Sequence, residues 1–258
     1  MSPTASSEDG LARAGRAPTK RILAERLEME LLSGNLPAGT KLESERALAQ
    51  RFGVSRPMVR EVLHGLEQRG LIEVAPGRGA FVRDVRVTDV VRPVDALYRQ
   101  RRPTPRDVIH ARLMLERETA ALAARHATEE DLLALDVSLT RFDAARDVVS
   151  RARADIDFHA TIARAAHSQV IEIMFSSIAG LTFELMLRSL GDPSVVREGV
   201  PYHREILCAI RARDPEAAAA AMTGHLDVAL RTYGDDLDKS LDLVAQRSIE
   251  QLMGLSGD

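Results

Sequence analysis

The sequence predicts a mainly α-helical protein of two domains with one small β-hairpin, and three observations support this fold class. Apolar residues recur with helical spacing along most of the 258 residues. Apolar and polar residues alternate on both sides of residues 76–79, which indicates a hairpin. Residues 1–86 carry 14 Lys and Arg against 11 Asp and Glu, whereas residues 87–258 carry 21 against 27. Net charges of +3 and −6 are expected when only the first half binds a polyanion.

The first domain, expected over residues 18–86, contains three short helices and the hairpin. A helix near 20–33 is followed by one that begins after Ser44 and ends at Gly53, and by a third that begins after Ser55. Serine is a preferred N-cap, and glycine suits the left-handed residue past a helix end. Three helices followed by a hairpin form a winged helix-turn-helix, whose recognition helix lies in the major groove of DNA.

The second domain is expected to be an all-α bundle of six or seven helices over residues 104–235. Its segments are rich in Ala and Leu and have the lengths usual for a bundle, about 15 to 25 residues. A linker or first helix is expected over 87–103, and a C-terminal helix near 236–253 with a tail over the rest of 236–258. Residues 1–17 lack apolar periodicity, so a disordered tail is expected there. The helix-start signals are Thr104-Pro105, Thr128, Asp192-Pro193 and Asp214-Pro215.

The cysteine count and the hydropathy pattern indicate a cytoplasmic protein with no membrane partner. Cys208 is the single cysteine, which excludes a disulfide framework. It lies in a helical pattern, so we expect it to be a small core residue. The N-terminus has no apolar signal region, and no later stretch approaches the roughly 20 uninterrupted apolar residues of a membrane span.

Arginines of the first domain are expected to converge on one DNA-binding surface. Arg56 and Arg60 are four residues apart at the start of the third helix, Arg46 begins the preceding helix, and Arg78 lies at the hairpin tip. Residues at the N-terminal end of a recognition helix reach base edges, and basic side chains hold phosphates. The alternative is that each arginine is simply solvated. The surface predicts double-stranded DNA as a partner.

The second domain contains a possible metal-binding pattern. Asp155 and His159 are four residues apart in the helical segment ADIDFHATIARAAH, a spacing that places both side chains on one face. A surface pair is the alternative reading. His203 and His225, on two other expected helices, can supply further nitrogen donors, because three helices that cross in a bundle can surround an ion.

Both domains resemble parts of a known family. Residues 32–82 resemble the DNA-binding domain of the GntR family of bacterial transcription regulators, through Ser-Glu-Arg-x-Leu-Ala, Val-Ser-Arg-x-x-Val-Arg and Gly-Arg-Gly-x-Phe-Val. Residues 105–235 resemble the FCD effector domain of the FadR subfamily, through DIDFHATIARAAHSQVI and HARLMLERETAALAA. The DNA contacts that the resemblance implies are Arg46, Ser55, Arg56, Arg60, Arg78 and Gly79, with Pro57 and Met58 where small polar residues are frequent.

The resemblance also implies a metal and an effector. Asp155, His159, His203 and His225 fill the four metal-ligand positions of the family. Zinc is the expected divalent ion, with nickel and manganese as alternatives. Arg112 stands where the family binds the carboxylate of its effector, and its alternative is an internal salt bridge to Glu116, one turn along. Arg188 is a candidate second arm for the effector, with surface exposure as its alternative.

The sequence therefore predicts a ligand-responsive DNA-binding transcription regulator and not an enzyme. A homodimer is expected to bind a near-palindromic operator and to act as a repressor, with activation left open. A small organic carboxylate at the metal is expected to change the spacing of its two DNA-binding domains. The alternatives are a metal-dependent hydrolase fused to a DNA-binding domain, for which no spare general base stands out, and an architectural DNA-binding protein.

Overall fold

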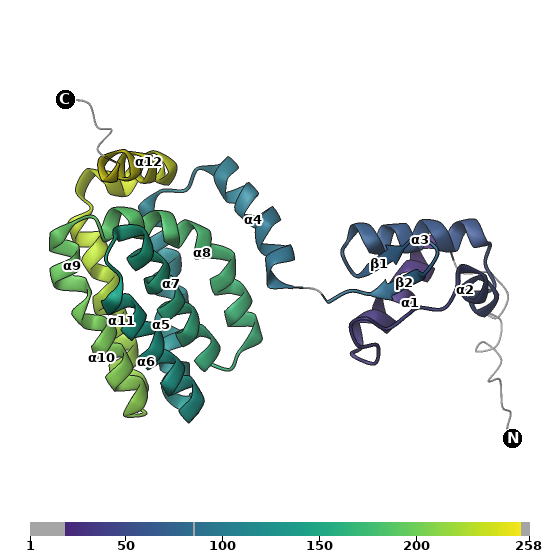
Figure 1. Cartoon of the computed structure of the whole chain (residues 1–258), viewed down its shortest axis with the longest axis horizontal. Helices are drawn as coiled ribbons and strands as arrows, with labels where there is room; N and C mark the ends of the chain where they lie inside the picture. Colours follow the sequence, from purple (N-terminus) through teal and green to yellow (C-terminus); the bar gives the residue numbers. More distant parts are fainter. Residues whose placement is uncertain (1–18, 85, 254–258) are drawn as a thin grey trace, which may run out of the picture. The chain divides into compact units, whose positions relative to one another are not determined.

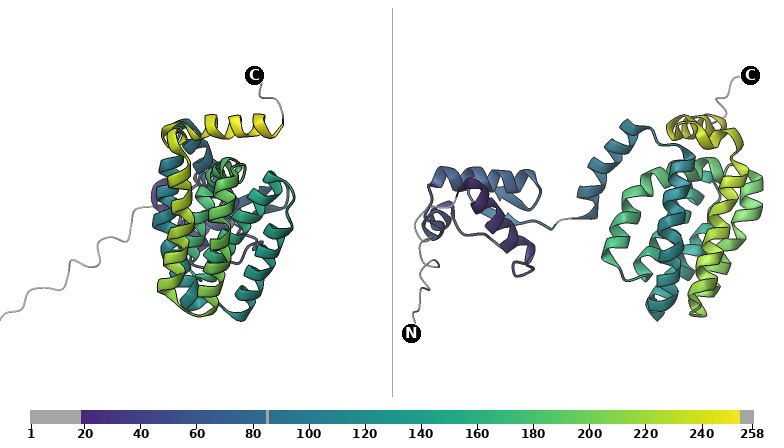
Figure 2. Two further views of the ribbon diagram at one scale, coloured as in Figure 1. Left: turned by 90° about the vertical axis from the view of Figure 1, so that its left-hand side faces the viewer. Right: turned by 180° about the vertical axis from the view of Figure 1, so that it is seen from behind.

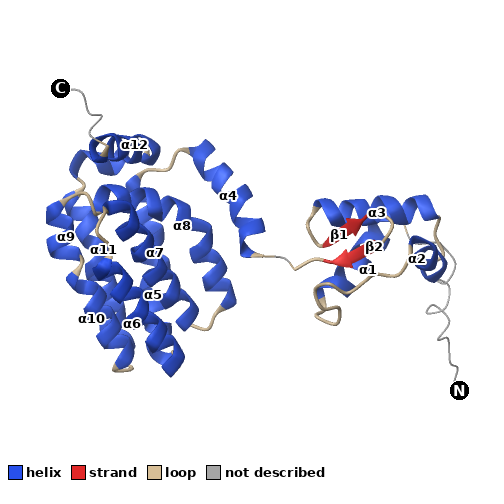
Figure 3. Cartoon of the chain, in the orientation of Figure 1, coloured by secondary structure: helices blue, strands red, loops and turns tan. Residues whose placement is uncertain are grey.

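The computed structural model describes residues 19–84 and 86–253, and it divides between Asp89 and Val90 into two compact units. Each unit has its own hydrophobic core. Figures 1 and 3 show a small unit with the two strands and a larger, all-helical unit. The tail expected over residues 1–17 lies outside the described residues.

The N-terminal unit has the predicted winged helix-turn-helix. Ser44 and Ser55 cap the second and third helices, because their hydroxyls accept hydrogen bonds from the backbone N–H groups of Ala47 and Met58. Gly53 ends the second helix with φ +64°, the left-handed conformation expected of it. Its elements are α1 (Lys20–Leu32), α2 (Glu45–Phe52), α3 (Arg56–Gln68), β1 (Ile72–Ala75) and β2 (Gly79–Val82).

Strands β1 and β2 form the wing, an antiparallel pair that runs in register from Ile72 opposite Val82 to Ala75 opposite Gly79. The backbone N–H of Val74 donates to a carboxylate oxygen of Glu67, which ties the wing to α3. The core beneath the wing is made of apolar side chains that are nearly inaccessible to solvent: Leu23, Leu27, Leu48, Val59, Val62, Leu66 and Ile72.

The C-terminal unit is a helical bundle, as predicted, and its helix count agrees with the expectation. Nine α-helices follow residue 86 among the described residues, and seven of them, α5 to α11, lie within 104–235. The break between α9 and α10 at Val200 and Pro201 is one that helix-start signals did not reveal. The helices are α4 (Val87–Arg101), α5 (Pro105–His126), α6 (Glu129–Ala144), α7 (Val148–Ala165), α8 (Gln169–Ser189), α9 (Pro193–Gly199), α10 (Pro201–Arg211), α11 (Pro215–Thr232) and α12 (Leu241–Leu252).

Most of the predicted start signals work as expected. Thr104 and Thr128 each form a complete capping box, with Asp107 and Asp131 three residues on. The last helix is different. Residues 234–238 form a short 3-10 helix, η1 (Gly234–Asp238), so α12 begins at Leu241 and not near residue 236. In Figures 1 and 2, α12 lies across one end of the bundle.

The expectation that Cys208 is a core residue is wrong, because its side chain is exposed on α10. Its neighbours Leu207 and Ala209 are buried. Successive side chains on a helix are about 100° apart, so a position between two buried ones can still face water. Apolar character alone therefore did not identify the face of the helix.

The expectation that the chain has no candidate membrane span also needs correction. Among the described residues, α8 has the length and the apolar composition of a spanning helix. However, Phe175, Leu181 and Leu185 on α8 are buried in the bundle, and Glu184 on the same helix forms an ion pair with Arg99 of α4. These contacts are those of a core helix in the bundle.

Two glycines of the N-terminal unit allow a matched test of its backbone. A Cβ atom added to either Gly53 or Gly65 would meet no atom within 4 Å, but only Gly53 has positive φ. Gly53→Ala should destabilise the unit by about 1–2 kcal/mol, because L-residues are strained in this conformation. Gly65→Ala, inside α3, should stabilise it by about 0.5–1 kcal/mol. Native-state hydrogen exchange of the α2 and α3 amides measures both changes in stability. Changes of the same sign in the two variants would contradict the left-handed conformation of Gly53.

Candidate metal centre and nucleic-acid interface

Four predicted ligands come together inside the bundle. Asp155 and His159 lie one turn apart on α7, His203 lies on α10, and His225 lies on α11. One ligand atom from each residue can be chosen so that all four atoms lie within 4.8 Å of one another. The side chains of Asp155, His159 and His203 are buried, and His225 is half-buried. The helical spacing on α7 and the crossing of α10 and α11 therefore make one cluster.

Asp155 is at the centre of this cluster. Its Oδ1 lies 3.1 Å from Nε2 of His203, and its Oδ2 lies 3.8 Å from Nε2 of His159. The ring of His225 stacks 5.1 Å from that of His159 and lies 4.5 Å from that of His203, measured between ring centroids. The carboxylate thus faces three imidazole rings that surround it.

Several polar atoms of the cluster have no hydrogen-bond partner within the described part of the chain. They include Oδ2 of Asp155 and both ring nitrogens of His203. The 3.1 Å contact between Nε2 of His203 and Oδ1 of Asp155 lacks hydrogen-bond geometry, so it does not satisfy Nε2. An unsatisfied buried polar group costs about 1–3 kcal/mol. A divalent cation would satisfy these atoms together, since one carboxylate oxygen and three imidazole nitrogens are a donor set that transition metals accept. The cluster can therefore hold a metal ion.

The protonation states suit an ion as well. Burial by itself raises the pKa of Asp155, but the contact with His203 and the neighbouring imidazoles lower it well below its usual range. Burial lowers the pKa of His225 well below its usual range, and the nearby His203 and His159 lower it further. Its Nδ1 lies 3.1 Å from the carbonyl oxygen of Gly199, which only accepts, so Nδ1 carries the proton and Nε2 keeps its lone pair.

Arg112 forms the internal salt bridge that was its alternative role. Its Nε and Nη2 donate to the two carboxylate oxygens of Glu116 at 2.5 and 3.3 Å, and both side chains are buried. Nη2 also lies 3.4 Å from Nε2 of His159. Burial raises the pKa of Glu116, but Arg112 and His159 together lower it to about 2. Arg112 therefore reaches the cluster with its charge already balanced.

The sequence did not show that Glu116 also contacts a metal-ligand candidate. Its Oε2 lies 2.5 Å from Nδ1 of His159, although this contact lacks hydrogen-bond geometry. Glu116 and Arg112 are on α5 and His159 is on α7, so the contact depends on how two helices pack. Spacing along one helix could reveal the pair with Arg112 but not this contact.

A small cavity of about 30 Å³ adjoins the cluster. It is lined by Arg112, Asp155, His203 and His225 and by apolar residues of α8 and α9, among them Met186 and Val195. A water molecule needs about 10–15 Å³ by this measure. The cavity thus has room for an ion with one or two waters, but not for an organic acid of several carbon atoms.

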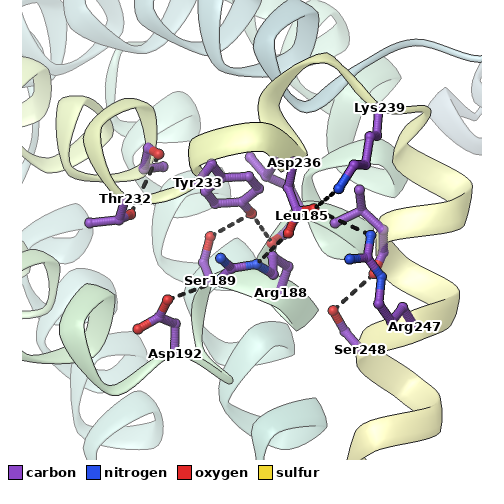
Figure 4. Close-up of polar contacts among 12 residues, drawn as sticks. Leu185, Arg188, Ser189, Asp192, Thr232, Tyr233, Asp236, Lys239, Arg247 and Ser248 are labelled. Carbon is purple, nitrogen blue, oxygen red and sulfur yellow. Dashed lines mark hydrogen bonds and ion pairs between the residues drawn. The ribbon is translucent and has the colours of Figure 1, made fainter. Parts of the chain in front are cut away.

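Arg188 lies away from this cavity. Its Nη1 donates to Asp192 at 3.0 Å and its Nε to Asp236 at 3.2 Å, and its guanidinium lies 4.9 Å from the ring centroid of Tyr233. Figure 4 shows Asp236 between Arg188, Lys239 and Arg247. A separate cavity of about 600 Å³ lies here, between α8 and α12. The structure therefore does not bring Arg188 to the predicted metal ligands.

The predicted DNA-contacting residues lie on α2, α3 and the wing. A groove of about 830 Å³ is lined by Ser44 at the start of α2, by Pro57 and Arg60 of α3, and by Arg78 and Gly79 of the wing. Arg46, Ser55 and Arg56 are also exposed, and Met58 is half-buried. The guanidinium of Arg78 lies 5.6 Å from the ring centroid of Phe81, which supports it at the wing.

One acidic residue on this surface was missed by sequence reasoning. Glu45, the first residue of α2, accepts hydrogen bonds from Nε and Nη2 of Arg60 at 3.0 and 2.9 Å. Its carboxylate also lies 3.9 Å from Nη2 of Arg56. The contact lowers the pKa of Glu45, chiefly through the hydrogen bond from Arg60. Since Glu45 and Arg60 lie on different helices, no spacing along one helix could pair them.

Two family models match the chain. The model described as "Bacterial regulatory proteins, gntR family" matches residues 19–82, and the model described as "FCD domain" matches residues 107–228. The first range holds the winged helix-turn-helix, and the second holds all four residues of the Asp-His cluster.

Transcription regulators are similar to this chain over most of their length. The putative L-lactate dehydrogenase operon regulatory protein of Escherichia coli is 31% identical over 214 residues, which cover 79% of this chain and 82% of that protein. The Glc operon transcriptional activator of E. coli is 29% identical over 230 residues, covering 85% and 91%. The solved structure of Streptococcus agalactiae GntR is 25% identical, covers 83% of this chain and 100% of its own, and has a TM-score of 0.64.

These relatives are transcription regulators and not enzymes, which confirms the expectation that the chain has no enzymatic role and leaves the hydrolase alternative without support. With both domains matched and a relative above 30% identity over most of its length, the chain belongs to the GntR family of bacterial transcription regulators, in the FadR-like subfamily with a C-terminal FCD domain, and is a DNA-binding regulator.

Proposed function

We propose that this regulator changes its DNA binding when a small organic carboxylate binds at a zinc ion in the helical unit. The observation that supports the proposal most strongly is the buried Asp155, His159, His203 and His225 cluster, with its unsatisfied polar atoms. Zinc suits three imidazoles and one carboxylate, and nickel and manganese are alternatives. When bound, the ion supplies a positive charge that attracts an anion.

Arg112 is the proposed second partner of the effector. It lines the cavity beside Asp155, and its guanidinium can form two parallel hydrogen bonds with a carboxylate. Because the cavity admits only an ion and water, the acid must displace part of its wall, which Met186, Leu190 and Val195 form. The name of the E. coli L-lactate dehydrogenase operon regulator supports a small hydroxy acid as the effector. Arg188 is not part of this proposal.

The proposed response requires a series of contacts that links the cavity to the DNA-binding unit. The contacts nearest to the cavity are present. Ser189 lines the cavity, and its hydroxyl lies 2.9 Å from that of Tyr233. Tyr233 directly precedes η1, and Asp236 within η1 is held by Arg188 of α8. Movement of α8 at the cavity would therefore be transmitted to η1 through these contacts (Figure 4).

The segment after Tyr233 in turn contacts the joint between α4 and α5. Asp238 accepts two hydrogen bonds from Arg106 at 2.7 and 2.9 Å. The backbone N–H of Leu241 donates to the carbonyl oxygen of Pro103 at 2.9 Å. Helix α4 leads from this joint toward the N-terminal unit along the chain. An effector needs to couple to DNA binding by only about 1–3 kcal/mol, a size that contacts of this kind can carry.

The proposed assembly is a cytoplasmic homodimer that acts as a repressor. Two winged helix-turn-helix units related by a twofold axis match two half-sites of a near-palindromic operator. In this arrangement the predicted contact residues face the DNA: Arg46, Ser55, Arg56, Pro57, Met58, Arg60, Arg78 and Gly79.

A DNase footprint on the promoter of the regulator's own gene tests the response. The footprint is recorded in Zn²⁺, with and without lactate and related acids. A footprint that no acid changes would support DNA binding but contradict the proposed response to an effector.

His203→Ala should abolish tight metal binding, because it removes one of four donors. Elemental analysis of the purified full chain should show about one zinc per chain for the wild type and much less for the variant. Any acid that raises the melting temperature in the presence of Zn²⁺ should lose this effect, since only a ligand of the folded state stabilises it. His126→Ala, on an exposed position of α5, is the control. Full zinc occupancy in His203→Ala would remove this histidine from the ligand set.

Glu116→Gln should weaken metal binding about 10- to 100-fold, the usual effect of changing the carboxylate beside a ligand histidine, because Oε2 of Glu116 lies 2.5 Å from Nδ1 of His159. It should also destabilise the fold by about 3–5 kcal/mol, because Arg112 would be left as a buried charge without its carboxylate. Titration with zinc in a competing chelator and chemical unfolding measure the two effects. Glu118→Gln makes the same change on an exposed part of the same helix and should alter neither.

Arg60→Ala should cost about 1–3 kcal/mol of binding free energy on a cognate operator, with a much smaller loss on random DNA, if Arg60 reads a base. Fluorescence anisotropy with an operator duplex obtained by in vitro selection and with a scrambled duplex of the same composition gives both values. An equal loss on the two duplexes would make Arg60 a phosphate contact instead.

A further inference from the structure

The proposed DNA-reading surface carries an acidic side chain between its arginines. Glu45 holds Arg60 by two parallel hydrogen bonds at 3.0 and 2.9 Å, and its carboxylate lies 3.9 Å from Arg56. DNA is itself a polyanion, so a carboxylate at this place opposes binding unless it has another role. The two arginines and the glutamate together carry a net charge of +1 and not +2.

The pair contributes little to the stability of the fold. The side chains of Arg60 and Glu45 are 68% and 30% exposed, and water screens an ion pair this exposed, so that it stabilises the fold only slightly. It is therefore easily exchanged for contacts with DNA. The carboxylate lies deeper than the guanidinium, which leaves the outer edge of the guanidinium facing solvent.

Glu45 affects base and phosphate contacts differently. A phosphate attracts a guanidinium mainly by charge, whatever the sequence. A guanine is recognised by two donors in a fixed plane, which contact its O6 and N7. A carboxylate bound to one edge of Arg60 reduces the attraction to phosphate, but it fixes the plane of the guanidinium and leaves the other edge available for a base.

We infer that Glu45 is a specificity-determining residue of this regulator: it orients Arg60 toward base edges and weakens the hold of Arg60 on phosphates at non-cognate DNA. Glu45 acts through Arg60 and is a positioning residue. The inference rests on the proposed placement of Arg60 at the DNA. It predicts that loss of the carboxylate strengthens binding to random DNA more than binding to the operator.

Glu45→Gln tests this, since the amide has the same shape without the charge. Glu61→Gln is the matched control: Glu61 follows Arg60 on α3, and its carboxylate pairs with Lys20 at 2.6 Å. Each variant removes one negative charge from the N-terminal unit, but only Glu45 forms hydrogen bonds with the side chain of Arg60. The full chain is titrated against the in vitro selected duplex and a scrambled duplex at several salt concentrations, and circular dichroism checks the fold.

Glu45→Gln should raise the affinity for the scrambled duplex about threefold to fivefold and steepen its logarithmic salt dependence by about 0.9, the value for one more phosphate contact. Affinity for the selected duplex should change less, so the ratio of the two affinities falls. Glu61→Gln should leave the ratio unchanged within about twofold, because a charge without a hydrogen bond to Arg60 acts on both duplexes alike.

Three results would overturn the inference. The affinity ratio could be unchanged in Glu45→Gln, both glutamine variants could change it equally, or Glu45→Gln could weaken binding to the selected duplex alone, which would make Glu45 a direct base contact. In the double variant with Arg60→Ala, the effect of Glu45→Gln on the ratio should largely vanish. Arg60→Ala by itself tests the placement of Arg60, so failure of the proposed function is distinguishable from failure of this inference.

Discussion

A carboxylate buried among three imidazoles is the constraint on which the C-terminal unit depends. Moving an ionised carboxylate out of water costs several kcal/mol even after relaxation, and Asp155 is almost fully buried. The three histidines offset only part of this cost, because the unsatisfied atoms of Asp155 and His203 remain. The bundle therefore holds a negative centre whose geometry is favourable chiefly with a cation between its donors.

The neighbouring Arg112–Glu116 pair adjusts this centre without changing its net charge. A buried arginine without a partner would repel a cation, whereas Glu116 balances it and lies beside Nδ1 of His159. An incoming carboxylate would thus meet a guanidinium whose charge is already compensated, and would have to share it with Glu116. Affinity for the proposed effector would then depend on the proposed ion at least as much as on Arg112, which agrees with a cavity too small to hold an acid without movement.

Local signals in the sequence were enough for most of the elements, but not for the contacts between them. Serine, threonine and aspartate caps act within one turn, so the starts of α2, α3, α5 and α6 were predicted from a few residues each. Asp155 and His159 share a helix, and their proximity followed from spacing. Whether His203 and His225 join them depends on how α10 and α11 pack, and the family resemblance supplied it. The contact of Glu116 with His159 and the direction of Arg188 depend on packing alone, which no local pattern encodes.

A comparison of Arg112–Glu116 with Arg60–Glu45 shows how burial decides what a glutamate–arginine pair does. Arg112 and Glu116 are side chains exposed by only 1% and 3%, so separating them leaves a charge in a medium of low dielectric constant and costs several kcal/mol. Arg60 and Glu45 form the same bidentate contact near the surface, where water screens the charges and breaking the contact costs little. The first pair therefore behaves as part of the scaffold around the proposed metal site. The second can open each time DNA arrives, because only an exposed pair exchanges its partner for a base or a phosphate at a cost that binding repays.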